Sequence, residues 1–125
     1  MKKIGIGLAV LLAFVSVSFA APKDGTYSGE IMDSQCAKNG THDMMLKKEG
    51  MEKMIGMPEG KKMCTTNCVK KMGSKYVLFN APSKAVYQLD DQTKPEQFAG
   101  QNVKITGTLD KATKTIHVTD ITAAS

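Results

Sequence analysis

The chain has 125 residues and a formal net charge of +5, and every one of its basic residues is a lysine. Specific recognition of phosphate or nucleic acid usually depends on the paired hydrogen bonds of arginine, so this composition argues against a nucleic-acid-binding protein. The lysines are instead typical of the solubilising surface of a small domain.

The amino-terminal end has the features of a cleavable export signal. A short positive region, residues 1–3, precedes an apolar run over residues 4–17, and Ser18 and Ala20 supply the small residues that signal peptidase reads. The apolar run is short for a membrane-spanning helix. No cysteine lies beside the cleavage site, so a lipid anchor is not indicated. We therefore expect a signal peptide over residues 1–20 and a periplasmic or secreted protein with no stable membrane anchor after cleavage.

Removal of residues 1–20 leaves 105 of the 125 residues, which is enough for one domain with one modest core. The single domain is expected to cover residues 21–125, with its charge reduced to +3 by the loss of Lys2 and Lys3. Three cysteines remain in a compartment that favours disulfides. Because the number is odd, at least one thiol stays free, pairs between chains or binds a metal.

Alternating and β-branched segments predict five strands. They cover residues 25–33, 75–80, 84–89 and 101–109, followed by a last strand that carries Ile116, Val118 and Ile121. A short helix is expected over residues 93–100. The predicted fold class is mainly β with a helical insertion (β+α), as a small five-stranded OB-like barrel. An SH3-like barrel or a small sandwich would also fit the number of strands.

A long Cys- and Met-rich connection, residues 34–74, separates the first two strands. Pro58 suits the first turn of a helix that extends to Met72, and Gly73 supplies the left-handed residue that commonly ends a helix. Upstream, Thr41 is expected to cap a shorter helix over residues 42–49.

This connection also holds the candidate metal ligands. Cys64 and Cys68 are four residues apart and therefore share one face of the long helix, where both can reach one ion. With Cys36 and His42 they make a Cys3His donor set, which suits tetrahedral Zn²⁺, whereas thiolates with methionine thioethers would favour Cu(I).

A disulfide is the alternative interpretation of the same cysteines. Cys36 would bond Cys64 or Cys68 and fasten the helical connection to the barrel. Closing a loop of about 30 residues would stabilise the domain by roughly 3 to 4 kcal/mol in the chain-entropy picture.

Three further groups of residues have structural interpretations. The seven methionines of the connection are expected to be apolar filler, although methionine is also a soft ligand. His117 should point outward from the last strand, and the barrel aromatics should pack in the core rather than stack on bases. These residues are Met44, Met45, Met51, Met54, Met57, Met63 and Met72, and Tyr27, Tyr76, Phe79, Tyr87 and Phe98.

The chain lacks the common catalytic patterns. It has no Ser-His-Asp order, no glycine-rich phosphate loop and no haem-attachment motif, and its adjacent carboxylates, Asp90 and Asp91, are expected to lie in a turn. The sequence therefore favours a binding protein over an enzyme.

Several motifs together resemble a group of small exported bacterial proteins of unknown function. A strand ending in Asp-x-x-Cys leads to a histidine, a Cys-x3-Cys pair and a Gly-x-x-Tyr strand. The motifs are DSQC at residues 33–36, HDMM at 42–45, CTTNCV at 64–69, GSKYVL at 73–78, VYQL at 86–89 and VKITGTL at 103–109. The resemblance implies periplasmic placement and an OB-like barrel, and it supplies no activity.

Two functions follow as hypotheses. The first is an exported protein that binds copper or zinc through Cys36, His42, Cys64 and Cys68. The second is a disulfide-stapled OB-like module that binds an envelope peptide, glycan or protein. Thiol redox activity is a third, less favoured hypothesis, because Cys-x3-Cys lacks the two-residue spacing of thioredoxin-like sites.

Overall fold

The structure is a computed structural model that describes residues 24–124, so the predicted signal peptide lies outside the described residues. It is mainly β, with five strands and a few short helical elements. In chain order the elements are β1 (Gly25–Asp33), α1 (Ser34–Asn39), α2 (Asp43–Lys48), η1 (Glu52–Met54), α3 (Pro58–Met72), β2 (Tyr76–Asn80), β3 (Ala85–Leu89), η2 (Lys94–Phe98), β4 (Asn102–Asp110) and β5 (Thr115–Ala123).

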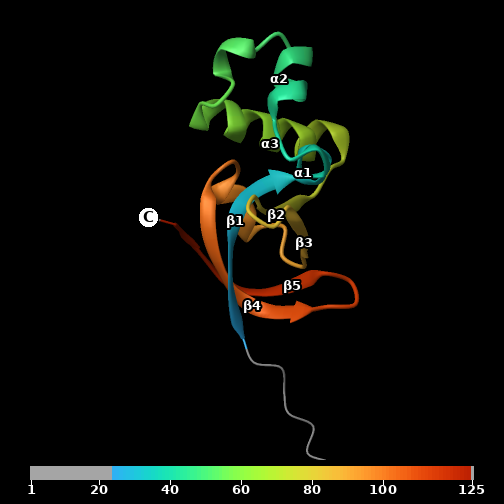
Figure 1. The fold of residues 1–125 in the computed structure, drawn as a ribbon, viewed down its shortest axis with the longest axis vertical. Helices are drawn as coiled ribbons and strands as arrows, with labels where there is room; N and C mark the ends of the chain where they lie inside the picture. Colours follow the sequence, from blue (N-terminus) through green and yellow to red (C-terminus); the bar gives the residue numbers. More distant parts are fainter. Residues whose placement is uncertain (1–23, 125) are drawn as a thin grey trace, which may run out of the picture.

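The five strands pair in the order β1-β2-β3-β5-β4 and close into a barrel (Figure 1). Strand β1 joins the two ends of the sheet, since its first part pairs with β4 and its last part with β2, and Glu30 has a partner on both sides. All neighbours are antiparallel except β3 and β5. Closure leaves few unpaired strand edges in a sheet this small.

The helical connection between β1 and β2 lies at one end of the barrel, where α3 crosses above the end of β1 (Figure 1). Helix α3 begins at Pro58, which suits a first turn, and ends at Gly73 with a φ of 72°. Among the described residues, no helix is long and apolar enough to cross a membrane.

Two apolar clusters fill the molecule on the two sides of the β1–β2 sheet. Inside the barrel, Ile31 and Leu78 pack with apolar residues of β3, β4 and β5. On the other face, Met32 and Val77 pack with residues of α1, α2 and α3. Successive strand residues point to opposite faces, so adjacent residues of β1 and β2 serve different clusters. Each fully buried aliphatic side chain stabilises the fold by about 1.5–3 kcal/mol.

The five predicted strands and the long helix are confirmed, with ends shifted by a few residues. The short helix expected over residues 93–100 is the 3₁₀ helix η2, and the helix expected over residues 42–49 is the shorter α2. The N-cap of α2 is His42, one residue after the predicted Thr41, and its side chain makes no capping hydrogen bond, although Thr41 Oγ1 accepts the Asp43 N–H at 3.2 Å. The prediction omitted α1, a six-residue helix that follows β1 directly.

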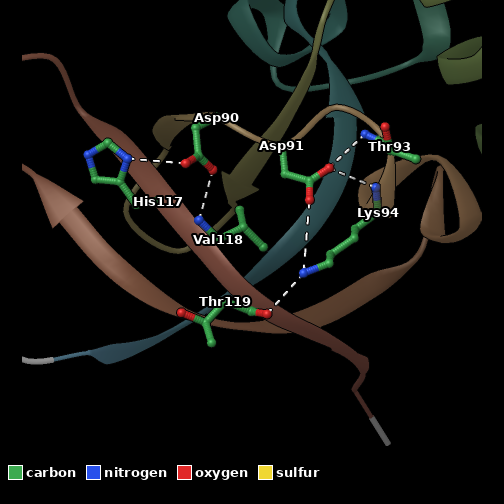
Figure 2. A network of polar contacts seen from close by, with 7 residues as sticks. All are labelled: Asp90, Asp91, Thr93, Lys94, His117, Val118 and Thr119. Carbon is green, nitrogen blue, oxygen red and sulfur yellow. Dashed lines mark hydrogen bonds and ion pairs between the residues drawn. The ribbon is translucent and has the colours of Figure 1, made fainter.

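The parallel β3–β5 contact is short, and side chains extend it (Figure 2). Only two residue pairs lie in register there. Just beyond them the Asp90 carboxylate accepts the Val118 N–H at 2.8 Å and lies 3.1 Å from His117 Nδ1. Lys94 Nζ donates to the carbonyl oxygen of Thr119, the residue that follows Val118 in β5, at 3.0 Å. Asp90 therefore continues the barrel closure where the backbone ladder stops.

Asp90→Ala is expected to lower the free energy of unfolding by about 0.5–1.5 kcal/mol, because the Val118 N–H loses its acceptor. Chemical denaturation near neutral pH measures the change. Asp120→Ala is the matched control, since Asp120 is an exposed aspartate of β5 with no side-chain hydrogen bond among the described residues. Equal stabilities of the two variants would contradict a role of Asp90 in closing the barrel.

The contribution of Asp90 should also depend on pH. The hydrogen bond from the Val118 N–H, opposed by burial and assisted by His117, lowers the pKa of Asp90 below its usual value of 3.8. A lowered folded-state pKa gives stabilisation that is present above the unfolded-state pKa and is lost as the pH falls through the folded-state pKa. The difference between wild type and Asp90→Ala should therefore shrink below about pH 4.

Candidate metal centre

Four potential ligand atoms, one each from Asp33, Cys36, His42 and Cys64, all lie within 4.8 Å of one another, and all four residues are buried. They come from the last residue of β1, from α1, from the connection before α2 and from the middle of α3. Residues up to 31 positions apart in the chain thus meet beneath α3, at the end of the barrel that the helical connection covers.

Asp33 determines how the chain passes from strand to helix. It is fully buried, and its Oδ2 accepts the N–H groups of Gln35 at 3.1 Å and Cys36 at 3.0 Å, which caps α1. A capping carboxylate satisfies backbone donors that have no partner inside the helix. Its other oxygen, Oδ1, is buried without a hydrogen-bond partner. The cap therefore fixes Cys36 one turn from the strand end and leaves one carboxylate oxygen free for a ligand.

His42 is held through one ring nitrogen only. Its Nε2 lies 3.0 Å from Glu30 Oε2, and the other Glu30 oxygen, Oε1, lies 3.2 Å from Lys61 Nζ. Its Nδ1 is buried without a partner. Helix α1 ends at Gly40 with a φ of 73°, a conformation that glycine adopts readily, and this turn brings His42 back over β1.

The sulfur atoms of Cys36 and Cys64 are 3.6 Å apart, and the two thiols are not bonded. A disulfide would need about 2.05 Å between them. Two thiolates on one tetrahedral Zn²⁺ with Zn–S bonds of about 2.3 Å would be about 3.8 Å apart. Cys36–Cys64 is one of the two disulfides that the alternative interpretation allows. All three cysteines are free in the structure.

The charge of the thiol pair is concentrated on Cys64. The hydrogen bond from Cys36, opposed by burial and assisted by His42, lowers the pKa of Cys64 to about 5. The pKa of Cys36 is raised, because its proton is held by Cys64 and because burial and Asp33 disfavour a second negative charge. These opposite directions favour ionisation of Cys64 over Cys36 within the pair.

His42 carries the balancing positive charge. Burial lowers its pKa, but the interactions with Cys64 and Glu30 outweigh burial and raise the pKa to about 9. Burial likewise raises the pKa of Glu30, whereas His42 and Lys61 lower it, with a net decrease. A buried ion pair needs such partners, since an isolated charge would be costly to desolvate.

Of the predicted ligands, the structure brings Cys36, His42 and Cys64 together and places Cys68 outside the group that lies within 4.8 Å. Cys68 is buried one turn after Cys64 on α3. Burial, with Asp33 and Cys64 as further causes, raises its pKa to about 12. Sequence reasoning missed Asp33 and Glu30. An aspartate directly before a helix is a capping signal that could have indicated Asp33, but only the fold brings Glu30 to His42.

Two cavities flank the buried group. The larger, about 740 Å³, is lined by Glu30, His42 and Lys61 among other residues. The smaller, about 190 Å³, reaches Cys64 and Cys68. The site can therefore be approached from the histidine side and from the thiol side.

The remaining predictions divide into two groups. His117 is exposed beside Asp90, and all five aromatic residues pack in or against the two apolar clusters, as predicted. The filler prediction is wrong for four methionines, because they are exposed on the helical connection and do not belong to either core cluster. Their exposed fractions are 63% for Met44, 48% for Met57, 39% for Met63 and 46% for Met72.

The donor set has a defined chemical preference. Carboxylate, imidazole and thiolate are the three ligand types of protein zinc sites, and four of them complete a tetrahedron. A purely soft ion such as Cu(I) would instead favour sulfur alone. The arrangement of Asp33, Cys36, His42 and Cys64 therefore fits a borderline divalent ion.

Comparison with known families adds one match. Residues 69–124 match the family model described as Protein of unknown function (DUF5818). The carboxyl-terminal part of the chain is thus similar to an uncharacterised family. No curated protein and no solved structure matches the chain. The matched region covers β2 to β5 and the end of α3, and it begins one residue after Cys68, so it contains none of Asp33, Cys36, His42, Cys64 and Cys68.

The reduced, metal-free protein should show one thiolate that titrates near pH 5 in its ultraviolet thiolate absorbance, because Cys64 alone has a lowered pKa. Cys64→Ser should remove this transition. His42→Ala should move it to higher pH, since the thiolate loses its positive neighbour. Cys68→Ser is the control and should leave the transition in place. A transition that survives Cys64→Ser would assign the charge to another cysteine.

Proposed function

We propose that the protein is a small exported binding protein that holds one borderline metal ion, of the zinc type, with Asp33, Cys36, His42 and Cys64 as ligands. One observation carries the proposal. His42 Nδ1 and Asp33 Oδ1 are both buried without a hydrogen-bond partner, and both residues belong to the same compact group as two thiols. Buried polar atoms in proteins are nearly always paired, and a metal ion would satisfy both at once.

The contact between Glu30 and His42 supports this assignment. A metal-binding histidine usually donates its second ring N–H to a carboxylate, which fixes the ring and strengthens the ligand. Glu30 Oε2 lies 3.0 Å from His42 Nε2, so the nitrogen left for a metal is Nδ1. Lys61 in turn holds Glu30 from the other side. His42 thus has the orientation and the outer partner of a metal ligand.

Charge also favours a divalent ion. With Cys36, Cys64 and Asp33 ionised and His42 neutral, a bound Zn²⁺ leaves a single net negative charge among the ligands. Glu30 and Lys61 beside them cancel each other. Binding must release protons from His42 and Cys36, so metal affinity should fall as the pH is lowered.

The barrel that carries the site is, we propose, of the OB type. The closed order β1-β2-β3-β5-β4 and the helical element between β3 and β4 support this assignment. Export to the periplasm is proposed from the amino-terminal sequence pattern alone. The resemblance to exported proteins of unknown function is consistent with that location.

Metal binding is tested with Co²⁺ as a coloured substitute for Zn²⁺ on the reduced, chelator-treated protein. Wild type should bind one Co²⁺ with thiolate-to-cobalt absorption and the spectrum of a tetrahedral site, and Zn²⁺ should displace it. Cys64→Ser and His42→Ala should abolish or strongly weaken binding. Glu30→Gln should weaken it by about 10–100-fold, because the outer partner of His42 is altered while the ligands stay.

The control variant is His117→Ala, which removes the only other histidine and should bind Co²⁺ like wild type. Failure of the reduced wild-type protein to bind Co²⁺ or Zn²⁺ would refute the proposal. So would Co²⁺ absorption that is unchanged in His42→Ala.

The short distance between Cys36 and Cys64 favours one alternative, the disulfide-stapled module. In that case protein isolated from the periplasm would have a mass lower by two hydrogens, one alkylatable thiol and no metal. The cavity of about 740 Å³ beside Glu30 would then be the place for an envelope peptide or glycan. Mass spectrometry with and without alkylation distinguishes the two functions.

A further inference from the structure

Sulfur atoms gather around the smaller cavity in a way that the zinc-type site does not use. Five of the residues that line this space of about 190 Å³ contain sulfur: Met45, Met51, Cys64, Cys68 and Met72. Two are thiols and three are thioethers. Thioethers are poor ligands for zinc and good ligands for soft ions, so this second group of donors differs in kind from the first.

One wall of the cavity is a single face of α3. Cys64, Cys68 and Met72 follow one another at intervals of four residues, which places their side chains along one line of the helix. The two cysteines of this line are buried, at 5% exposed for Cys64 and 2% for Cys68, whereas Met72 at its end is 46% exposed. The line leads from the buried metal centre to the solvent.

Further lining residues come from α2 and from the residues between α2 and η1. Met45 lies in α2 and Met51 directly precedes η1, and both are partly buried against the apolar cluster that contains Cys64 and Cys68. The two methionines therefore border the same cavity as the two thiols. A soft ion in this space would meet sulfur from both segments.

Core packing does not account for Met72. An apolar side chain that is nearly half exposed contributes little to burial, and an unbranched thioether at the mouth of a sulfur-lined cavity has the chemistry of a first contact for a soft ion. Cys68 likewise has no function in the zinc-type site, because it lies outside that ligand group. Both residues are explained together if the cavity holds an ion of its own.

We infer that this cavity is a separate binding site for a soft monovalent cation, Cu(I), held by Cys68, by Cys64, which it shares with the zinc-type site, and by one or two of the thioethers of Met45, Met51 and Met72 that line the same space. The inference rests on the proposed function only through Cys64. Cu(I) accepts low coordination numbers with sulfur donors alone, which this cavity offers and the neighbouring centre, with its carboxylate and imidazole, does not. Sharing of Cys64 implies that the two ions compete.

The test measures Cu(I) affinity under anaerobic conditions by competition with a coloured Cu(I) chelator, using the reduced mature protein. Cys68→Ser should weaken binding by about tenfold or more, which corresponds to about 1.4 kcal/mol. The double variant Met51→Leu, Met72→Leu should also weaken it, while leucine keeps the apolar volume. X-ray absorption of the wild-type complex should show sulfur ligands only.

The matched controls are Met44→Leu and Met63→Leu, which change exposed methionines that do not line the cavity and should bind Cu(I) like wild type. His42→Ala should also keep its Cu(I) affinity while losing Co²⁺. Thermal unfolding and circular dichroism show whether each variant is folded. If Cys68→Ser does not fold, the Cu(I) affinities of the methionine variants test the inference.

The outcomes separate the two sites. Cu(I) binding that is lost in His42→Ala and unaffected by the Cys68 and methionine variants would place the ion in the buried centre and overturn this inference, while the zinc-type function stands. Unchanged affinity in every variant would overturn it as well. Cu(I) affinity that falls in Cys68→Ser and in the double methionine variant would support this inference. If Co²⁺ binding is at the same time unchanged in His42→Ala, the proposed function is refuted.

Discussion

The carboxylate of Asp33 is the point on which the helical connection depends. It is the last residue of β1, it is fully buried, and it caps α1 through two hydrogen bonds from backbone N–H groups. By accepting the first N–H groups of α1, the Asp33 carboxylate stabilises a helix that begins directly after β1. Cys36 is therefore placed one turn from the strand end, beneath the position where α3 later crosses.

Glu30 orients His42 and places a negative charge beside it. It lies where β1 changes its partner from β4 to β2, and its carboxylate contacts both His42 and Lys61. The loop before α2 and the first turns of α3 are thus tied to the same strand residue. The buried imidazole is held by one nitrogen, while the other faces the thiols without a partner. Orientation and electrostatics of the site both follow from the position of Glu30 in the barrel.

The two faces of the β1–β2 sheet explain why a site can form here at all. One face lies inside the barrel, and the other is covered by α1, α2 and α3. The thiols of Cys36, Cys64 and Cys68 lie in the second cluster, where water is largely excluded and ionised groups must be paired or ligated. A barrel with a short connection between its first two strands would expose this face instead.

The sequence by itself determined the five strands and the long helix Pro58–Met72, because these depend on local periodicity and turn residues, and it indicated the candidate sulfur and imidazole donors, because such residues are scarce elsewhere in the chain. Tertiary structure decided which donors meet. Asp33 joins the ligand group and Cys68 leaves it, since the separation of side chains is set by how α3 crosses β1 and not by spacing in the chain. Met72, which sequence reasoning assigned to packing, is exposed. Which face of a helix is buried depends on the elements that pack against it, and the sequence of the helix alone does not specify them.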